Sequence, residues 1–329
     1  MTVAKKARRR IVTALALLGC GVGVPAWAAE YPDRPVRFIV PYAPAGLSDL
    51  VSRRVAEGLT KRLGQQVVVE NRPGANGILG LSAAARSAAD GYTLVLVSTS
   101  SLVLNPMTQP NLPFAAERDF EPIALIASSP LLLVVNNDLP ANTLNELIDL
   151  LKNKSGQLSY ASPGIGHMSH IAGEMFSRRF GVSIIHVPYK GESPALADLV
   201  AGRTQMMFGS VSGTLPMLKA GKVRVLAVAS DRRVRVVPDI PTFAELGAKE
   251  FSIMIWFGVA APAGVPSPIT KRIGSAVMEA VGEAGMRTWL DQTAQEPGTL
   301  QGEQFRAFVD SERVRWKPFV EASGAAASR

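Results

Sequence analysis

The sequence predicts an α/β fold in which parallel-rich sheets are flanked by helices and divided between two lobes. Short apolar runs alternate with helical segments along most of the chain, and this alternation is typical of parallel sheets with helices on both faces. A strand, a loop of small residues and a helix follow one another in residues 36–63, and the same order returns in residues 158–180. About 300 residues remain after a leader, and 47% of the chain is hydrophobic, which is enough for two cores.

The first 28 residues have the form of an export signal. Five basic residues open it: Lys5, Lys6, Arg8, Arg9 and Arg10. A short apolar segment follows at residues 11–18, and Ala26-Trp27-Ala28 matches the small-x-small cleavage pattern, so we expect cleavage after Ala28. The alternative is a lipoprotein box, Leu17-Leu18-Gly19-Cys20, in which Cys20 is lipidated. No other long apolar segment follows, so we expect a soluble mature chain.

The charge and the cysteine content argue against nucleic-acid binding, disulfide bonds and thiol chemistry. Without the five basic residues of the leader, 30 Lys and Arg stand against 27 Asp and Glu, so the formal charge falls from +8 to +3. No basic stripe remains, and we expect no nucleic-acid partner. Cys20 is the only cysteine, so the mature chain has neither disulfides nor thiol chemistry.

Residues 36–63 show best how the chain builds a candidate anion site. The apolar run at residues 36–40 predicts a buried strand, and the prolines and glycine of residues 41–46 end it. Ser48 and Asp49 are suited to capping the helix that follows. Free N–H groups and the positive end of the helix dipole favour an anion in such a loop. A plain βα turn would give the same pattern.

The remaining elements repeat this alternation. We expect strands at residues 66–70, 93–97, 121–127, 131–135, 158–162, 183–187, 206–209 and 223–229, and helices at residues 78–89, 143–152, 167–180, 195–201, after Pro268 and at 304–321. Ser193 followed by Pro194 predicts an N-cap with proline at the first helical position. Residues 98–101 are hydroxyl-rich and follow a strand, at the end where ligands bind in open parallel sheets.

Catalytic chemistry finds little support in the motifs. Gly209-Ser210-Val211-Ser212-Gly213 resembles a nucleophile elbow, but its central residue is Val211. His167, His170 and Glu174 share a helix spacing that would suit a metal, but it lacks the tight spacing of H-E-x-x-H, and packing and helix hydrogen bonds explain it better. We therefore expect no catalytic residue, no metal and no cofactor. Binding a small anion between the lobes is favoured, and an enzyme such as a hydrolase or isomerase is the alternative.

Several motifs then match one family in the expected order. They are Tyr31-Pro32-x-Arg34-Pro35-Val36, Pro41-Tyr42-x-Pro44-x-Gly46-x-Ser48-Asp49, Val69-Glu70-Asn71-Arg72-Pro73-Gly74-Ala75-x-Gly77, His186-Val187-Pro188-Tyr189-Lys190-Gly191 and Pro238-Asp239-Ile240-Pro241-Thr242. With these motifs, nearly the whole mature chain resembles the Bug-type solute receptors of tripartite tricarboxylate transporters.

The resemblance implies a two-lobed periplasmic binding protein (type II-like) with its ligand cleft between the lobes. Lobe 1 would comprise residues 29–130 and 232–329, and lobe 2 residues 131–231. Two loops, residues 42–49 and 189–193, would grip a ligand carboxylate, partly through ordered water. The partners implied are the membrane subunits of a tripartite tricarboxylate-type transporter, or else a membrane sensor. We expect a periplasmic monomer.

The expected ligand-binding residues come from these loops and from residues 98–100 and 162–167. They are Tyr42, Ala45, Gly46, Ser48, Ser98, Thr99, Ser100, Ser162, Gly164, Gly166, His167, Tyr189, Lys190, Gly191 and Glu192. Asp49 and Ser193 would cap and hold the two loops. The two tyrosines would pack on the ligand and offer a hydroxyl, and Lys190 is either a charge partner or an exposed loop lysine. The family usually has glycine where this chain has Ala45, so Ala45 either has an ordinary backbone conformation or tightens the pocket.

Overall fold

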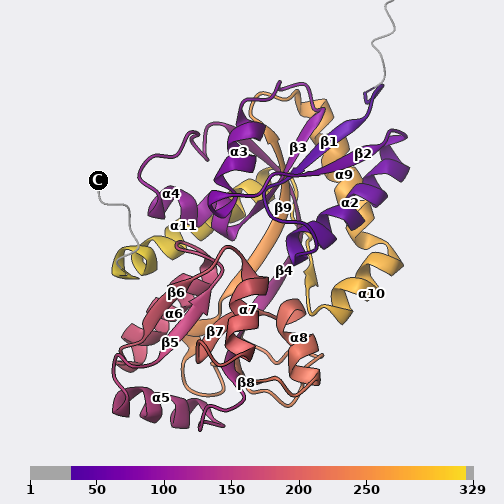
Figure 1. Cartoon of the computed structure of the whole chain (residues 1–329). Coiled ribbons are helices and arrows are strands. Elements are labelled where there is room, and N and C mark those ends of the chain that lie inside the picture. The colour runs from indigo at the N-terminus through magenta and orange to yellow at the C-terminus, as the bar shows by residue number, and fades with distance from the viewer. Residues whose placement is uncertain (1–30, 324–329) are drawn as a thin grey trace, which may run out of the picture. The chain divides into compact units, whose positions relative to one another are not determined.

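Two groups of parallel strands, connected through one long strand, organise residues 31–323, which are the part of the chain that the computed structural model describes (Figure 1). The strands are β1 (Val36–Val40), β2 (Val67–Asn71), β3 (Thr93–Ser98), β4 (Phe120–Asn136), β5 (Ser159–Ser162), β6 (Ile185–Pro188), β7 (Met206–Ser210), β8 (Val223–Val228), β9 (Met254–Pro262) and β10 (Glu296–Pro297). The helices are α2 (Leu47–Leu63), α3 (Ile78–Ala85), α4 (Asn105–Thr108), α5 (Leu144–Asn153), α6 (Met168–Phe180), α7 (Glu192–Val200), α8 (Val211–Lys219), α9 (Ser267–Gly282), α10 (Ala284–Gln292) and α11 (Glu303–Ser323). The predicted leader and its cleavage site lie outside the described residues.

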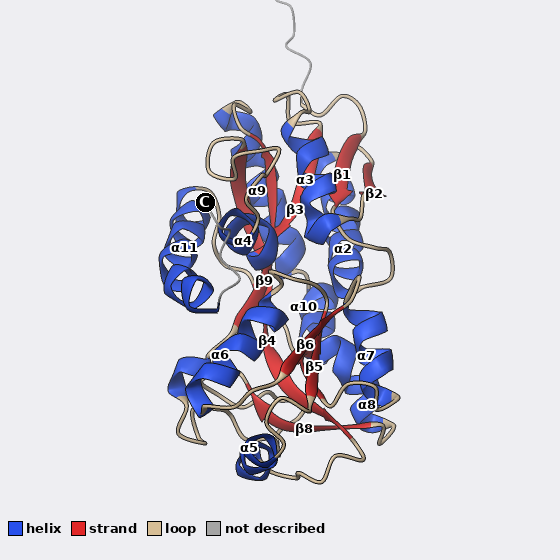
Figure 2. Ribbon diagram, turned by 60° about the vertical axis from the view of Figure 1, so that its left-hand side comes forward, coloured by secondary structure: helices blue, strands red, loops and turns tan. Residues whose placement is uncertain are grey.

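The strand order is β2-β1-β3-β9-β4-β7-β5-β6, with β8 and β10 also paired to β4. In the first group, β1 pairs in parallel with β2 and β3, while β9 is antiparallel to β3. In the second group, β5 pairs in parallel with β6 and β7. The mixed sheets and flanking helices confirm the predicted α/β class. Figure 2 shows α2, α3 and α9 beside the first group and α5 to α8 beside the second.

The long strand β4 corrects the prediction of two strands separated by residues 128–130. The chain runs without interruption from Phe120 to Asn136 and changes partners on the way. As far as Pro130 it pairs with β9, and from Leu131 it pairs with β7 and β8. Pro130 has no N–H to donate, and its position at this change of partners explains why a proline is tolerated in a central strand.

Two helix predictions were also wrong. Helix α7 begins at Glu192, three residues before the predicted start, and its N-cap is Gly191. Helix α8 was not predicted, because Ser212, Gly213 and the internal Pro216 are unfavourable in a helix. Ser210 starts α8 by accepting a hydrogen bond from the Gly213 amide at 3.1 Å. Within residues 31–323, no helix is both long enough and apolar enough to cross a membrane.

An aromatic cluster forms much of the core around β7 and β9. Phe176, Phe208, Phe243 and Phe251 lie with ring centroids 4.7–6.4 Å apart, and all four are fully buried. Such pairs add stabilisation to the burial of their apolar area. This packing fixes α6, which carries Phe176, against the strand that precedes α8.

Gly173 lies on the buried face of α6 directly against the Tyr160 ring. An added Cβ would come within 2.3 Å of that ring, so we expect Gly173→Ala to lower the free energy of unfolding by about 1–3 kcal/mol through overpacking. Urea unfolding measures this. Gly285→Ala is the control, since nothing lies within 4 Å of its Cβ position, and it should be neutral or stabilising by up to about 1 kcal/mol. Equal stability of Gly173→Ala and the parent would contradict the packing described.

Candidate functional site

The predicted binding residues follow the parallel strands of both groups. Tyr42 and Tyr189 lie in the loops after β1 and β6, and Ser98 and Ser162 are the last residues of β3 and β5. Because the strands within each group are parallel, these loops lie at one edge of that group. Ligands of open α/β sheets bind at this edge, outside the carboxyl ends of the strands.

Helix α2 begins directly after the first of these loops. Its N-cap is Gly46, which has no side chain to accept a hydrogen bond from the first turn. Ser48 and Asp49 lie inside the first turn, so the prediction that they cap the helix N-terminus was wrong. The Asp49 carboxylate instead accepts hydrogen bonds from the Ala45 amide (3.0 Å), Arg53 Nε (2.9 Å) and Asn71 Nδ2 (2.9 Å). It therefore holds the loop in place, while the first-turn amides of α2 have no side-chain cap.

Burial opposes ionisation of Asp49, but its three hydrogen-bond donors outweigh this effect and lower the pKa of the carboxyl group. The carboxylate is thus a fixed anion at neutral pH. Its charge is matched by Arg53, one helical turn along α2. Sequence reasoning missed Asn71, which also donates to the Tyr42 carbonyl oxygen at 3.1 Å.

Ala45 has a left-handed backbone conformation with φ of +65°. This value rules out the ordinary backbone conformation that was one of the two alternatives for Ala45. An L-residue pays roughly 1–2 kcal/mol in this region. The hydrogen bond from the Ala45 amide to Asp49 helps to hold the conformation, and the Ala45 side chain is exposed.

The end of β3 supplies three hydroxyl residues with different roles. The Ser98 hydroxyl lies 2.8 Å from the Tyr42 hydroxyl, so the structure brings these two predicted residues together. Burial raises the pKa of Tyr42, whose phenol therefore stays protonated. Thr99 accepts a hydrogen bond from the Trp256 amide at 3.0 Å and serves packing. Ser100 is 4% exposed, and its hydroxyl makes no hydrogen bond to another residue of the described chain.

The loop between β5 and α6 is fixed from within. Ser162 Oγ lies 2.7 Å from His186 Nε2, donates to the Gly164 carbonyl oxygen at 3.1 Å and accepts from the Gly164 amide at 3.2 Å. Gly164 and Gly166 have φ of +150° and +76°, which side chains disfavour. Ser162 is fully buried, so it shapes the loop from below.

The three histidines of the chain gather at this loop. His167 is the N-cap of α6 and accepts from the Ser169 amide at 3.2 Å, while His170 accepts from the Gly166 amide at 3.2 Å. The His186 ring stacks on His170 with centroids 4.1 Å apart, and on its other neighbour, Tyr160, at 4.8 Å. Burial, and next the neighbouring His170, lower the pKa of His167 and of His186 to about 4, so both are neutral at pH 7.

The histidine spacing that suggested a metal has another explanation. His170 Nε2 lies 4.0 Å from Glu174, and the Glu174 carboxylate accepts from the Tyr160 hydroxyl at 2.6 Å. No cluster of three or more His, Cys, Asp or Glu within residues 31–323 is placed to hold a metal ion.

The loop between β6 and α7 contains the strongest family motif. Gly191, the N-cap of α7, has φ of +122°, and its amide donates to the Pro163 carbonyl oxygen at 3.1 Å. The prediction that Ser193 caps this helix was therefore wrong, since Ser193 is the second residue of α7. As at Gly46, no side chain caps the first turn. The loops after β5 and β6 thus meet through Pro163 and Gly191.

The side chains of this second loop are oriented in different directions. The Tyr189 hydroxyl donates to Asp198 at 2.7 Å, and burial together with this carboxylate raises the pKa of Tyr189 to about 12. That hydroxyl is directed onto α7, and only the ring is left for a ligand. Lys190 is exposed, and no hydrogen bond or ion pair joins its side chain to another described residue. Glu192 accepts from the Ser210 amide at 2.6 Å and the Ser210 hydroxyl at 2.9 Å.

The two groups of loops approach each other through α4. The Cβ position of Gly166 lies 2.6 Å from Thr108 Oγ1, so the loop after β5 abuts α4 of the first group. Asn105 of α4 is bonded in turn to Asn76, through side-chain amides 2.9 Å apart. No hydrogen bond or ion pair within residues 31–323 joins the loop of Tyr42 to that of Tyr189. Sequence reasoning missed Thr108 and Asn105, because neither follows a predicted strand.

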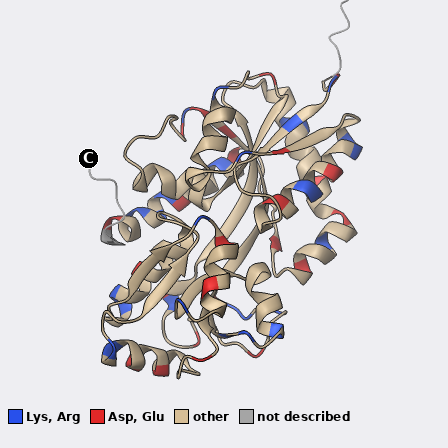
Figure 3. Ribbon diagram, in the orientation of Figure 1, with Lys and Arg blue, Asp and Glu red and all other residues tan. Residues whose placement is uncertain are grey.

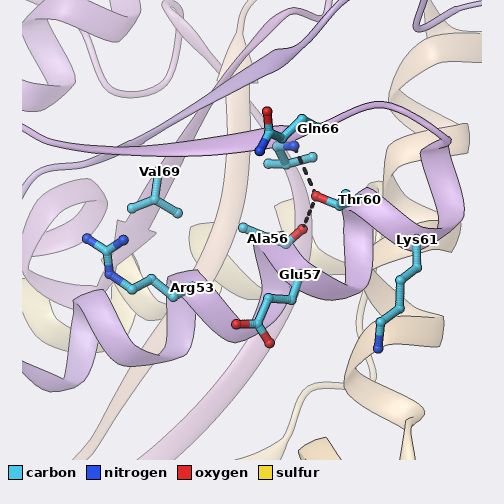
Figure 4. Close-up of a pocket in the computed structure, with 8 residues that line it drawn as sticks. Arg53, Ala56, Glu57, Thr60, Lys61, Gln66 and Val69 are labelled. Carbon is cyan, nitrogen blue, oxygen red and sulfur yellow. Dashed lines mark hydrogen bonds between the residues drawn. The ribbon is translucent and has the colours of Figure 1, made fainter.

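A separate depression of about 550 Å³ lies between α2 and β2. Its lining includes Arg53, Glu57, Lys61 and Val69 but no predicted binding residue (Figure 4). Thr60 holds its floor by accepting from the Val67 amide and donating to the Ala56 carbonyl oxygen. This depression is distinct from the loops described above.

Asp49 gives a test of the first loop. We expect Asp49→Asn to lower the free energy of unfolding at pH 7 by about 1–3 kcal/mol, because Arg53 loses its charged partner and the Ala45 amide its anionic acceptor. The pKa of Asp49 is lowered in the folded state, so above the ordinary aspartate pKa of about 4 its carboxylate adds to the free energy of unfolding. This stabilisation disappears as the pH falls through the pKa that Asp49 has in the folded state. Urea unfolding between pH 7 and pH 3 should therefore show the parent and the variant converging. Exposed Asp239→Asn is the control, and a pH-independent difference for Asp49→Asn would contradict the account.

Comparisons with known proteins agree with this geometry. The model of the "Tripartite tricarboxylate transporter family receptor" matches residues 51–325. Protein BugT of Bordetella pertussis is 36% identical over 306 residues, which cover 93% of this chain and 94% of BugT. The structure of periplasmic binding protein BugD has a TM-score of 0.83 at 32% identity and covers 91% of this chain and all of that one. A structure of R. palustris Rpa4515 with adipate has a TM-score of 0.86 at 31% identity, covering 90% and 99%.

These matches confirm the family and the two-lobed fold that the sequence motifs predicted. The structural neighbours are binding proteins of periplasmic type. The chain therefore belongs to the tripartite tricarboxylate transporter family of solute receptors.

Proposed function

We propose that this receptor captures a small carboxylate-containing solute between its two lobes and presents it to the membrane subunits of a tripartite tricarboxylate-type transporter. The observation that carries the proposal is the pair of helices α2 and α7, one in each strand group. Both begin at a glycine, Gly46 and Gly191, and neither first turn has a side-chain cap. Their free amides and positive dipole ends favour a negative group.

Three other helices are capped by a side chain, whereas α3, like α2 and α7, begins at a glycine without one, Gly77. Thr143 caps α5, His167 caps α6 and Ser210 caps α8, each by accepting a backbone hydrogen bond. In these helices the protein itself occupies a first-turn amide. The helices α2 and α7 thus retain donors for a ligand, and the adipate in the Rpa4515 structure supports a carboxylate as that ligand.

The proposed lobes are residues 29–130 with 232–329, and residues 131–231. The change of partners in β4 between Pro130 and Leu131 supports the first boundary. The return from β8 to β9 supports the second, since these strands belong to different groups. Movement of the lobes about these two crossings would close the site on its ligand and signal to the membrane partner.

Binding without turnover fits the polar groups of the site better than catalysis does. Among the described residues, Ser162 and His186 are the one serine hydroxyl and histidine ring within hydrogen-bond distance, at 2.7 Å. Ser162 is fully buried and already bonded to Gly164, so it is poorly placed to attack a substrate. Lys and Arg lie intermixed with Asp and Glu on the helices and loops (Figure 3), as suits a protein that binds solutes and not nucleic acid. We propose that the receptor is a periplasmic monomer.

A thermal-shift screen of the chain from Ala29 onward tests the proposal. Small carboxylic acids should raise the melting temperature selectively, and the matching amides should not. A ligand at 100 times its Kd adds about 2.7 kcal/mol to the free energy of unfolding. If no acid has an effect, even after unfolding and refolding to release bound solute, the proposal is contradicted.

Lys190 is predicted to add attraction for the bound anion. Because its side chain is exposed, Lys190→Gln should raise the Kd for the carboxylate about two- to fivefold, and added salt should reduce the difference. Isothermal titration at two salt concentrations measures this. Lys222→Gln removes the same charge from the turn after α8 and should leave the Kd unchanged. A Kd unaffected by Lys190→Gln would show that the lysine is only a surface residue.

A further inference from the structure

Glu192 places a carboxyl group beside the proposed binding loop. Burial raises the pKa of this group against the opposing effect of its two hydrogen bonds from Ser210, so the carboxylate form is favoured by a pH above neutral. It is the first residue of α7, so its backbone belongs to the turn that would receive the ligand carboxylate. Its side chain turns toward the next helix, where it accepts hydrogen bonds from the Ser210 amide and hydroxyl. Gly213 makes room for it, since a Cβ there would come within 3.1 Å of the Glu192 carboxyl group. The protein's own carboxylate thus occupies the N-terminus of α8.

Few other charges surround the loops. The charged residues of segments 42–49, 71–77, 98–105, 162–167, 189–193 and 210–213 are Asp49, Arg72, Lys190 and Glu192. Asp49 is paired with Arg53, and Arg72 is paired with Glu70 at 2.6 Å. This leaves Lys190 and Glu192, whose formal charges cancel. His167 is neutral at pH 7, so it adds no positive charge.

From this arrangement we infer that Glu192 determines the selectivity of the site. It disfavours solutes that would place a second carboxylate in lobe 2, beside the one bound by α2 and α7. The inference rests on the proposed function. One ligand carboxylate finds the amides of α2 and α7 and the cation of Lys190. A second carboxylate in lobe 2 could not bind the Ser210 amide and hydroxyl at the start of α8, because Glu192 already accepts their hydrogen bonds. It would also lie close to the carboxylate of Glu192, which begins α7. Like charges at this separation repel each other strongly in a partly buried site.

Matched pairs of acids test this inference. Isothermal titration at pH 8 would compare hexanoate with adipate, benzoate with terephthalate, and butyrate with succinate. We expect the parent to bind the monoacid of the best pair about tenfold more tightly than the diacid. Glu192→Gln should bring the two Kd values within about twofold of each other, mainly by lowering the Kd for the diacid. The amide retains an acceptor for the Ser210 N–H and a donor for its hydroxyl, so the fold should persist.

Two further variants separate charge from structure. Asp149→Asn removes an exposed charge from α5 and should leave the preference unchanged. Ser210→Ala keeps the charge of Glu192 but removes one of its hydrogen bonds, and it should also keep the preference for the monoacid. Loss of the preference in Ser210→Ala would show that the contact matters and not the charge.

The outcomes distinguish the inference from the function on which it rests. Tighter binding of the diacid by the parent, or an unchanged ratio in Glu192→Gln, contradicts the role of Glu192 and leaves carboxylate binding intact. No binding by any of the six acids, when the wider screen is also silent, contradicts the proposed function and the inference together.

Discussion

The central constraint on this structure is that the first amides of a helix need acceptors. Side chains supply an acceptor at the start of α5, α6 and α8, whereas the glycine N-caps of α2, α3 and α7 supply none. A loop that leaves such donors without an acceptor in the protein needs other contacts to hold its conformation. Asp49 holds the loop before α2, and the Gly191 amide bonded to Pro163 holds the loop before α7.

These supporting contacts carry a conformational cost that the packing offsets. Ala45 in the loop before α2 and Gly191 in the loop before α7 adopt positive φ angles, and Ala45 does so with a side chain. In the second group, the stacked rings of Tyr160, His186 and His170 lie beneath the loop and keep Ser162 in place. The rigid layer below the loops explains how backbone amides can be presented in a fixed direction. Binding then needs little reorganisation of the loops themselves.

The sequence predicted the parallel strands and the family well, because hydrophobic runs and loop motifs are local signals. It failed where distant partners decide the structure. Pro130 looked like a strand end, yet β4 continues through it and exchanges β9 for β7 and β8 as its partners. Ser193 and Pro194 have the composition of a helix start, but the bond from Gly191 to Pro163 begins α7 earlier. Likewise, no local pattern indicates that Glu192 reaches Ser210, 18 residues away along the chain.

The function proposed for this receptor requires that the amides of α2 and α7 share a single carboxylate. Nuclear magnetic resonance of the ¹⁵N-labelled protein, titrated with the acid selected by the thermal screen, tests it most directly. The amide signals of residues 47–48 and 192–193, which have no acceptor within the described chain, should shift downfield together and saturate at the same ligand concentration, since hydrogen bonding to a carboxylate deshields them. Shifts confined to one of these turns, or found instead around the depression between α2 and β2, would contradict the claim.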